Sequence, residues 1–101
     1  MTLKEIQKLV KKISEKFLEK EDIFETLSRL MEECGELAAE IRKIEKKGSK
    51  VYFCKSGDKE KLVEELIDVL NAIVAIANFY DLDLEKETDK IKIRIKKALN
   101  L

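Results

Sequence analysis

The chain of 101 residues has no histidine and only two cysteines, Cys34 and Cys54. Two thiols alone cannot complete a zinc site, and in a cytosolic chain they are usually reduced. Cys34 falls on the apolar stripe of its predicted helix, so we expect it to be a small core residue. The lack of histidine also argues against a di-iron bundle, which normally uses Glu-x-x-His pairs. A metal site in this chain must therefore rely on oxygen ligands.

The sequence also lacks an excess of charge of either sign and a long hydrophobic run. Its 21 basic and 21 acidic residues give a net charge of zero, whereas a general nucleic-acid binder shows a basic excess or a basic face. The apolar run over residues 66–77 is too short and too interrupted to span a bilayer. The first residues are amphipathic and lack the apolar block of a signal peptide. We therefore expect a cytoplasmic protein that binds neither nucleic acid nor membrane.

Apolar residues recur at intervals of three and four along most of the chain, which predicts amphipathic helices. The predicted helices cover about residues 3–17, 23–44, 59–80 and 84–99. Glycines and serines within residues 46–60 mark a loop, and either Ser56 or Asp58 is expected to cap the helix that follows. The pattern predicts a single all-α domain over residues 1–101, with a four-helix bundle-like architecture.

The helix predicted over residues 59–80 offers apolar groups on almost every side. Three neighbouring amphipathic helices in a chain this small cannot easily cover it. Apolar surface left exposed indicates a partner subunit. We therefore expect a homo-oligomer, either a dimer or a tetramer.

Two carboxylate pairs stand out: Glu33 with Glu36, and Glu65 with Asp68. Within each pair the spacing of three residues places both side chains on one face of a helix. Asp68 and Asn71 are the only polar residues of the apolar run over residues 66–77. A helix that is apolar nearly all round is normally buried, and a buried carboxylate is costly unless something compensates it. A hard cation is the obvious compensation.

The helical geometry separates some of the adjacent acidic residues. With Leu30 taken as part of the core direction, Glu33 lies on one flank of the apolar stripe and Glu32 points into solvent. The choice between Glu64 and Glu65 stays open, because both can reach Asp68. Taken alone, Glu33-x-x-Glu36 is typical of a solvated helix face. The second pair is different, since Asp68 interrupts an apolar run.

Four carboxylates around one pocket would repel one another strongly unless cations or protons bind. Oxygen-only ligands suit Mg²⁺ or Mn²⁺. Such ions bridge phosphate oxygens and activate water as a nucleophile. The two pairs together therefore favour a metal site.

The segments EECGELAAEI and EELIDVLNAIVAIANFYDLDL, separated by a loop, resemble the MazG-type all-α nucleoside triphosphate pyrophosphohydrolases. The signature of that family is E-x-x-E, a spacer and E-x-x-D. A glycine before the second glutamate, the DVLN sequence and the DLDL turn make the likeness more specific. The resemblance covers about residues 20–100.

The resemblance implies an Mg²⁺-dependent enzyme, with Mn²⁺ as the alternative ion. It would cleave ribo- or deoxyribonucleoside triphosphates to the monophosphate and pyrophosphate by attack of a metal-activated water. Glu33, Glu36, Glu65 and Asp68 would be the catalytic metal ligands. Members of the family are bundles that pair as homodimers or dimers of dimers, with the site completed across subunits.

The resemblance also suggests residues that contact the substrate. Asn71 would hydrogen-bond the base or the sugar, although a satisfied buried amide is an equally good interpretation. Lys86, Lys90 or Arg94 would meet the phosphates from a neighbouring subunit. For each of these three residues, a solvated helix face is the simpler interpretation.

An alternative function is a non-catalytic helical interaction or adaptor module, whose acidic residues are surface charge. Asp68 discriminates between the two, because surface charge has no reason to lie within LIDVLNAIVAIA. The substitution Asp68→Asn would abolish hydrolysis in an enzyme and change little in an adaptor.

Overall fold

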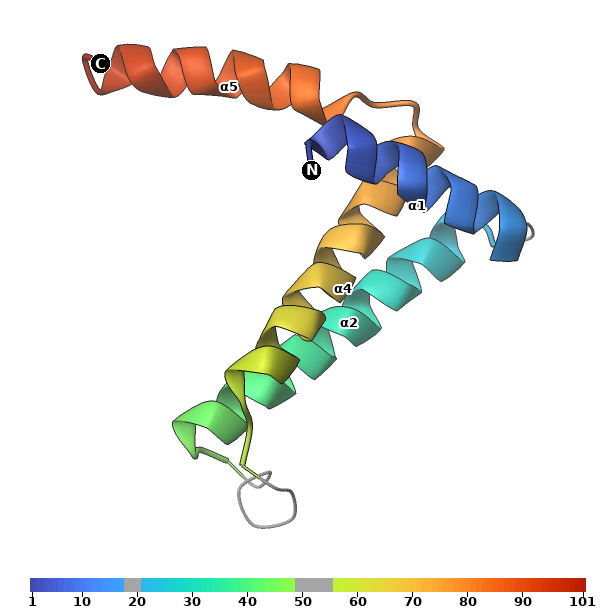
Figure 1. Cartoon of the computed structure of the whole chain (residues 1–101), viewed down its shortest axis with the longest axis vertical. Helices are drawn as coiled ribbons and strands as arrows, with labels where there is room; N and C mark the ends of the chain where they lie inside the picture. The colour runs from blue at the N-terminus through green and yellow to red at the C-terminus, as the bar shows by residue number, and fades with distance from the viewer. Residues whose placement is uncertain (18–20, 49–55) are drawn as a thin grey trace. The chain divides into compact units, whose positions relative to one another are not determined.

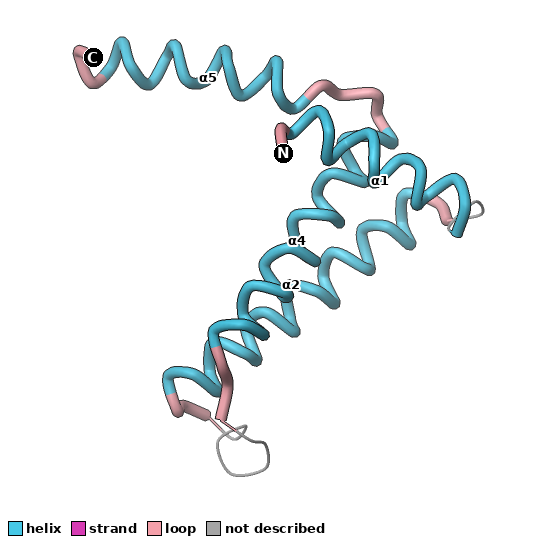
Figure 2. The backbone as a smooth tube through the Cα atoms, in the orientation of Figure 1, coloured by secondary structure: helices cyan, strands magenta, loops and turns pink. Residues whose placement is uncertain are grey.

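The computed structural model describes residues 1–17, 21–48 and 56–101. These residues form helices and turns without a strand (Figure 1, Figure 2). The helices are α1 (Leu3–Phe17), α2 (Ile23–Glu45), α4 (Lys59–Phe79) and α5 (Leu84–Ala98). The predicted all-α class and the predicted helices are thus confirmed, with ends that differ by a residue or so. Cys54 and much of the loop predicted over residues 46–60 lie outside the described residues.

Side chains at the helix starts satisfy backbone N–H groups that have no partner within the helix. Thr2 and Glu5 form a capping box at α1: the Glu5 N–H donates to Thr2 Oγ1 at 3.1 Å, and the Thr2 N–H donates to Glu5 Oε1 at 3.2 Å. Asp22 caps α2, since its Oδ1 accepts the Glu25 N–H at 2.8 Å. Lys46 ends α2 in the left-handed region, with φ of 56°.

Of the two capping candidates before α4, the structure selects Asp58, whose Oδ1 accepts the Lys61 N–H at 2.6 Å. Asp83 caps α5 in the same way, through the Lys86 N–H at 3.1 Å. The turn between α4 and α5 includes Asp81 in the left-handed region, with φ of 54°. Aspartate tolerates that conformation better than most side chains.

The described residues group into two compact units. One comprises Met1–Lys20 and Val74–Leu101, and the other comprises Glu21–Ile73. The helix α4 contributes to both. A single domain over residues 1–101 stays a prediction.

In the unit of residues 21–73, α2 and the first part of α4 run antiparallel, side by side (Figure 1). The least exposed side chains of α2 recur at steps of three and four and define its inward row: Thr26, Leu30, Glu33, Leu37, Glu40 and Ile44. The prediction that Cys34 lies in the core is wrong, because Cys34 is exposed. Ile41 is also 44% exposed. The buried face of α2 is therefore rotated from the predicted one. It includes Glu33 and Glu40, which face α4, and excludes Cys34 and Ile41.

The prediction that residues 66–77 are buried all round, with Asp68 among them, is wrong for the single chain. Leu66 and Ile67 are 48% and 47% exposed, and Asp68 is exposed as well. Among the described residues of this unit, α2 alone packs along this part of α4, which leaves Leu66 and Ile67 exposed. On α4, the deeply buried carboxylate is Glu65, at 4% exposure.

In the unit formed by residues 1–20 and 74–101, Gln7 of α1 holds the turn between α4 and α5. Gln7 Nε2 donates to Asn78 Oδ1 at 3.0 Å and to the Leu82 carbonyl at 2.8 Å. Its Oε1 accepts the Leu84 N–H at 3.0 Å, and Asn78 Nδ2 donates to the Gln7 carbonyl at 2.9 Å. The buried apolar residues of this unit are Val10, Val74, Ala75 and Ala77.

The helix α5 has no buried residue, and the apolar face predicted for it is uncovered in the single chain. Ile91, Ile95 and Leu99 are 43%, 51% and 61% exposed. Among the described helices, none combines the length and the apolar character that crossing a membrane requires.

Candidate metal centre

The structure brings three of the four predicted carboxylates together. Glu33 and Glu36 on α2 and Glu65 on α4 each place an oxygen within 4.8 Å of the other two. We call these three residues the carboxylate cluster. Glu33 and Glu36 lie on one face of α2, as their spacing of three residues requires. Glu65 meets them from α4.

The three members of the carboxylate cluster differ in burial: Glu65 is buried, Glu33 is half-buried and Glu36 is exposed. Glu33 Oε2 and Glu65 Oε2 are both buried and have no hydrogen-bond partner among the described residues. Buried carboxylate oxygens are normally paired or bound to a metal. The two unpartnered oxygens therefore make this cluster suitable for a cation.

Burial is the largest cause that raises the pKa of Glu33 above its ordinary value. The negative charges of Glu36, Asp68 and Glu65 raise this pKa further, as does a hydrogen bond with Glu36. Asp68 is exposed, but its charge acts on Glu33. The fourth predicted carboxylate thus lies near enough to add to the repulsion in the cluster. All four predicted acids contribute to one concentration of negative charge.

Lys61 supplies a positive charge that the sequence analysis missed. Its Nζ lies 3.2 Å from Glu65 Oε1 and 3.5 Å from Glu64 Oε2. The hydrogen bond to Glu65 raises the pKa of Lys61, and the charges of Glu65 and Glu64 add to this effect. Lys61 precedes Glu65 by four residues, a spacing at which side chains meet on a helix. That spacing was the signal available in the sequence.

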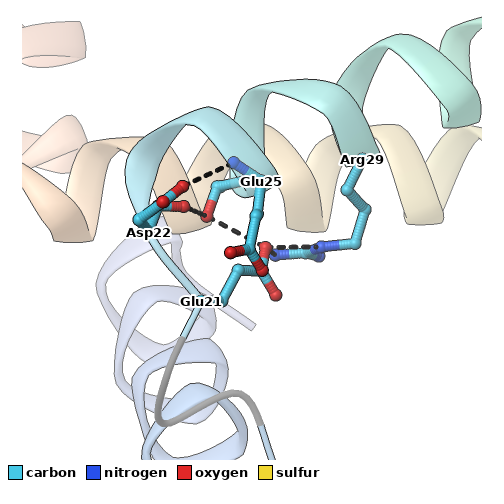
Figure 3. A network of polar contacts seen from close by, with 5 residues as sticks. Glu21, Asp22, Glu25 and Arg29 are labelled. Atoms are coloured by element: carbon cyan, nitrogen blue, oxygen red, sulfur yellow. Dashed lines mark hydrogen bonds and ion pairs between the residues drawn. The ribbon is translucent and has the colours of Figure 1, made fainter.

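Arg29 lies one turn before Glu33 on α2, but Glu21 binds it (Figure 3). Glu21 Oε1 accepts from Arg29 Nε at 3.1 Å and from Arg29 Nη2 at 3.0 Å. The same oxygen accepts from the Thr26 hydroxyl at 2.9 Å. This network, together with the Asp22 cap drawn beside it, secures the start of α2. The guanidinium therefore already has a carboxylate partner outside the cluster.

The other predicted site residues are more dispersed. Glu64 is exposed and Glu65 is buried, so the structure resolves the orientation that the sequence left open. Asn71 is half-buried, one turn beyond Asp68 on α4. Lys90 and Arg94 are exposed on α5, in the unit of residues 1–20 and 74–101, and Lys90 Nζ lies 3.3 Å from Glu87 Oε1. Their roles stay predictions.

The pKa of Glu33 leads to a prediction for the metal-free protein. A carboxyl whose pKa is raised by folding binds its proton more tightly in the folded chain, so its deprotonation costs stability as the pH rises above the ordinary value of 4.5. Without metal, Glu33→Gln should therefore melt at a higher temperature than wild type at pH 7. The difference should shrink as the pH falls toward 4.5 and be lost below that value.

Melting curves in EDTA between pH 4 and pH 8 would measure this difference. The matched control is Glu32→Gln, which removes the same charge from an exposed neighbour. A Glu33→Gln protein that is less stable than wild type throughout this pH range would contradict the proposed repulsion.

Comparison with known proteins identifies the family. The MazG nucleotide pyrophosphohydrolase domain matches residues 21–98 of the chain. The chain belongs to the MazG family. The resemblance noted from its two carboxylate pairs is confirmed. The matched MazG region begins just before α2 and contains the carboxylate cluster, Asp68 and Lys61.

A curated relative is described as uncharacterized protein YpjD of Bacillus subtilis (strain 168). It is 38% identical over 93 residues, which cover 89% of this chain and 79% of the relative. No solved structure matches this MazG chain significantly.

Proposed function

We propose that this MazG chain hydrolyses nucleoside triphosphates, ribo or deoxyribo, to the monophosphate and pyrophosphate in an Mg²⁺-dependent reaction. The observation that carries the proposal is the carboxylate cluster, in which three acidic side chains from two helices meet within 4.8 Å. Two of their oxygens are buried and lack a hydrogen-bond partner among the described residues. Family membership supplies the reaction class, and the cluster supports a metal-assisted form of it.

The donor set fits a hard divalent cation. Glu33, Glu36 and Glu65 offer only carboxylate oxygens, and Asp68 adds another nearby, which suits Mg²⁺ and also Mn²⁺. When bound, such an ion would neutralise phosphate charge and make a water molecule more acidic. Glu36 and Asp68 are exposed, so a triphosphate can approach the cluster from the solvent side.

The neighbouring residues of the chain have supporting roles in this proposal. Lys61 binds Glu65, with its Nζ 3.2 Å from Glu65 Oε1, and partly offsets the negative charge of the cluster. Asn71 lies one turn beyond Asp68 and would donate to the base or the sugar. Lys90 and Arg94 would meet phosphates from a neighbouring subunit.

The proposed assembly is a homodimer or a dimer of dimers. Large apolar side chains are exposed on both helices of the unit of residues 21–73: Leu27, Met31, Ile41, Val63, Leu66, Ile67 and Ile73. Burying such a surface against a second copy of the chain would stabilise both copies. Light scattering that gives at least twice the chain mass of 11.7 kDa would support this assembly.

The reaction is tested by measuring pyrophosphate release from a panel of nucleoside and deoxynucleoside triphosphates, with Mg²⁺ and with EDTA. We expect pyrophosphate and monophosphate in equal amounts, only in the presence of the metal. Release of orthophosphate instead would contradict the proposed bond cleavage. If no nucleotide is cleaved, the exposed apolar surface favours the second candidate, a helical interaction module.

A further inference from the structure

Glu40 is a buried glutamate that the proposed reaction does not use. It is 4% exposed and follows Glu33 and Leu37 along the inward row of α2. A carboxylate this deeply buried needs partners. Its partners show what the residue does.

Both oxygens of Glu40 are occupied. Oε1 accepts the backbone N–H of Asp58 at 3.1 Å, and Oε2 lies 3.6 Å from Lys43 Nζ. Glu40 thus differs from Glu33 and Glu65, each of which has a buried oxygen without a partner among the described residues. The contacts suit a structural connection between helices rather than a metal ligand.

Gly57 packs against the same place. A Cβ atom at this position would lie 2.8 Å from Glu40 Oε1, 2.9 Å from Ile44 Cγ1 and 2.9 Å from Lys43 Cβ. Two of these neighbours are carbons close to the α2 backbone, which cannot move aside easily. The absence of a side chain at Gly57 therefore allows the start of α4 to approach α2. We call Glu40, Gly57 and Asp58 the Glu40 clamp.

The Glu40 clamp and the carboxylate cluster are two sets of contacts between the same antiparallel helices, α2 and α4. Glu33 and Glu40 lie about two turns apart on α2, and Asp58 and Glu65 are separated by the same number of residues. The clamp joins Glu40 to Asp58, and the cluster joins Glu33 to Glu65. Figure 1 shows that the end of α2 and the start of α4 lie together at one end of this helix pair. The clamp therefore fixes the register in which α4 lies along α2.

We propose that Glu40 is a positioning residue for the metal site: its hydrogen bond to the Asp58 N–H sets the α2–α4 register that brings Glu65 to Glu33 and Glu36. This inference rests on the proposed function, because it takes the carboxylate cluster to be a metal site. Glu40 acts through the backbone of α4 and does not touch the metal.

The test is the affinity for Mn²⁺, measured by isothermal titration calorimetry on the full chain. Glu40→Ala should raise the Mn²⁺ Kd by about tenfold or more, as is typical when a group that orients metal ligands is lost. Glu40→Gln should stay within about twofold of wild type, because the amide oxygen accepts the same N–H at a similar position. Gly57→Ala should also weaken Mn²⁺ binding, since the added methyl group forces the start of α4 away from α2. In this variant residue 40 is still a glutamate.

The control for general destabilisation is Thr26→Ala. Thr26 is 6% exposed on the same inward row, and its hydroxyl donates to Glu21 at the other end of α2. This variant should lower the melting temperature without changing the Mn²⁺ Kd. Equal weakening of Mn²⁺ binding in Thr26→Ala and Glu40→Ala would overturn the inference. An unchanged Mn²⁺ Kd in Glu40→Ala would also overturn it, and so would a Glu40→Gln protein that binds Mn²⁺ as weakly as Glu40→Ala.

The same titration separates the inference from the proposed function. If wild type binds Mn²⁺ but cleaves no nucleotide, the function fails and the Kd values of the variants still decide the role of Glu40. If wild type binds no Mn²⁺, the metal site and the inference fail together. If Glu40→Ala does not fold, Gly57→Ala provides the test. An Mn²⁺ Kd of Gly57→Ala equal to that of wild type would overturn the inference.

Discussion

Glu65→Gln is expected to reduce Mg²⁺-dependent pyrophosphate release by at least about a thousandfold. Glu65 is the only buried member of the carboxylate cluster, and its Oε2 has no partner in the described part of the chain. The amide removes a negative oxygen ligand but keeps the shape of the side chain. A bound metal ion contributes several kcal/mol to transition-state stabilisation, and each 1.36 kcal/mol corresponds to about a tenfold change in rate. Initial rates at saturating Mg²⁺ would measure the loss.

The neighbouring residue provides the matched control. Glu64→Gln removes the same charge one position earlier on α4, from a side chain that is 68% exposed. This variant should retain activity within about threefold of wild type, because exposed ion pairs such as the one with Lys61 contribute little. Equal losses in the two variants would show that net charge, and not the buried ligand, controls the rate.

Gln7→Ala is expected to destabilise the protein strongly for a substitution of a half-buried polar residue. The substitution removes three hydrogen bonds, to Asn78, to the Leu82 carbonyl and from the Leu84 N–H. At about 1 kcal/mol for each bond, the free energy of unfolding should fall by about 2–3 kcal/mol. For a domain of this size that lowers the melting temperature by roughly 10–15 °C.

Lys8→Ala is the control, because Lys8 is exposed and follows Gln7 on the same helix. We expect its unfolding midpoint to stay close to that of wild type in thermal and urea denaturation. If Gln7→Ala has the same unfolding midpoint as Lys8→Ala, then the contacts of Gln7 with the turn between α4 and α5 do not stabilise the protein.

The helices were predictable because their signals are local. Apolar residues at intervals of three and four, with Asp58 and Asp83 at helix starts, give the bounds of α4 and α5 to within a residue or so. The choice between Ser56 and Asp58 as the cap depends on where the chain enters the helix. Sequence spacing alone does not contain that information.

The buried face of α2 was less predictable, for a physical reason. A rule that places apolar residues inside selects Cys34 and Ile41, whereas the structure turns Glu33 and Glu40 toward α4. Glu40 is tolerated through a contact made across the helix pair, with the Asp58 N–H. Glu33 faces the carboxylate cluster, where a cation bound as proposed would offset its charge. Such compensation depends on tertiary structure and leaves no periodic signal in either helix. The pairing of Lys61 with Glu65 was readable from its spacing, but charged pairs are too common on helices to single it out.

The ammonium group of Lys61 beside Glu65 has a consequence for which ions the protein selects. A sodium or potassium ion that displaced this group would replace one unit of positive charge with another and gain little from the exchange. A divalent ion brings twice the charge to the same carboxylates, so the exchange is electrostatically favourable for it alone. If the carboxylate cluster holds a cation as proposed, the Lys61 ammonium group would compete with that cation for Glu65. The protein would then discriminate between ions first by valence, and only then by ionic radius.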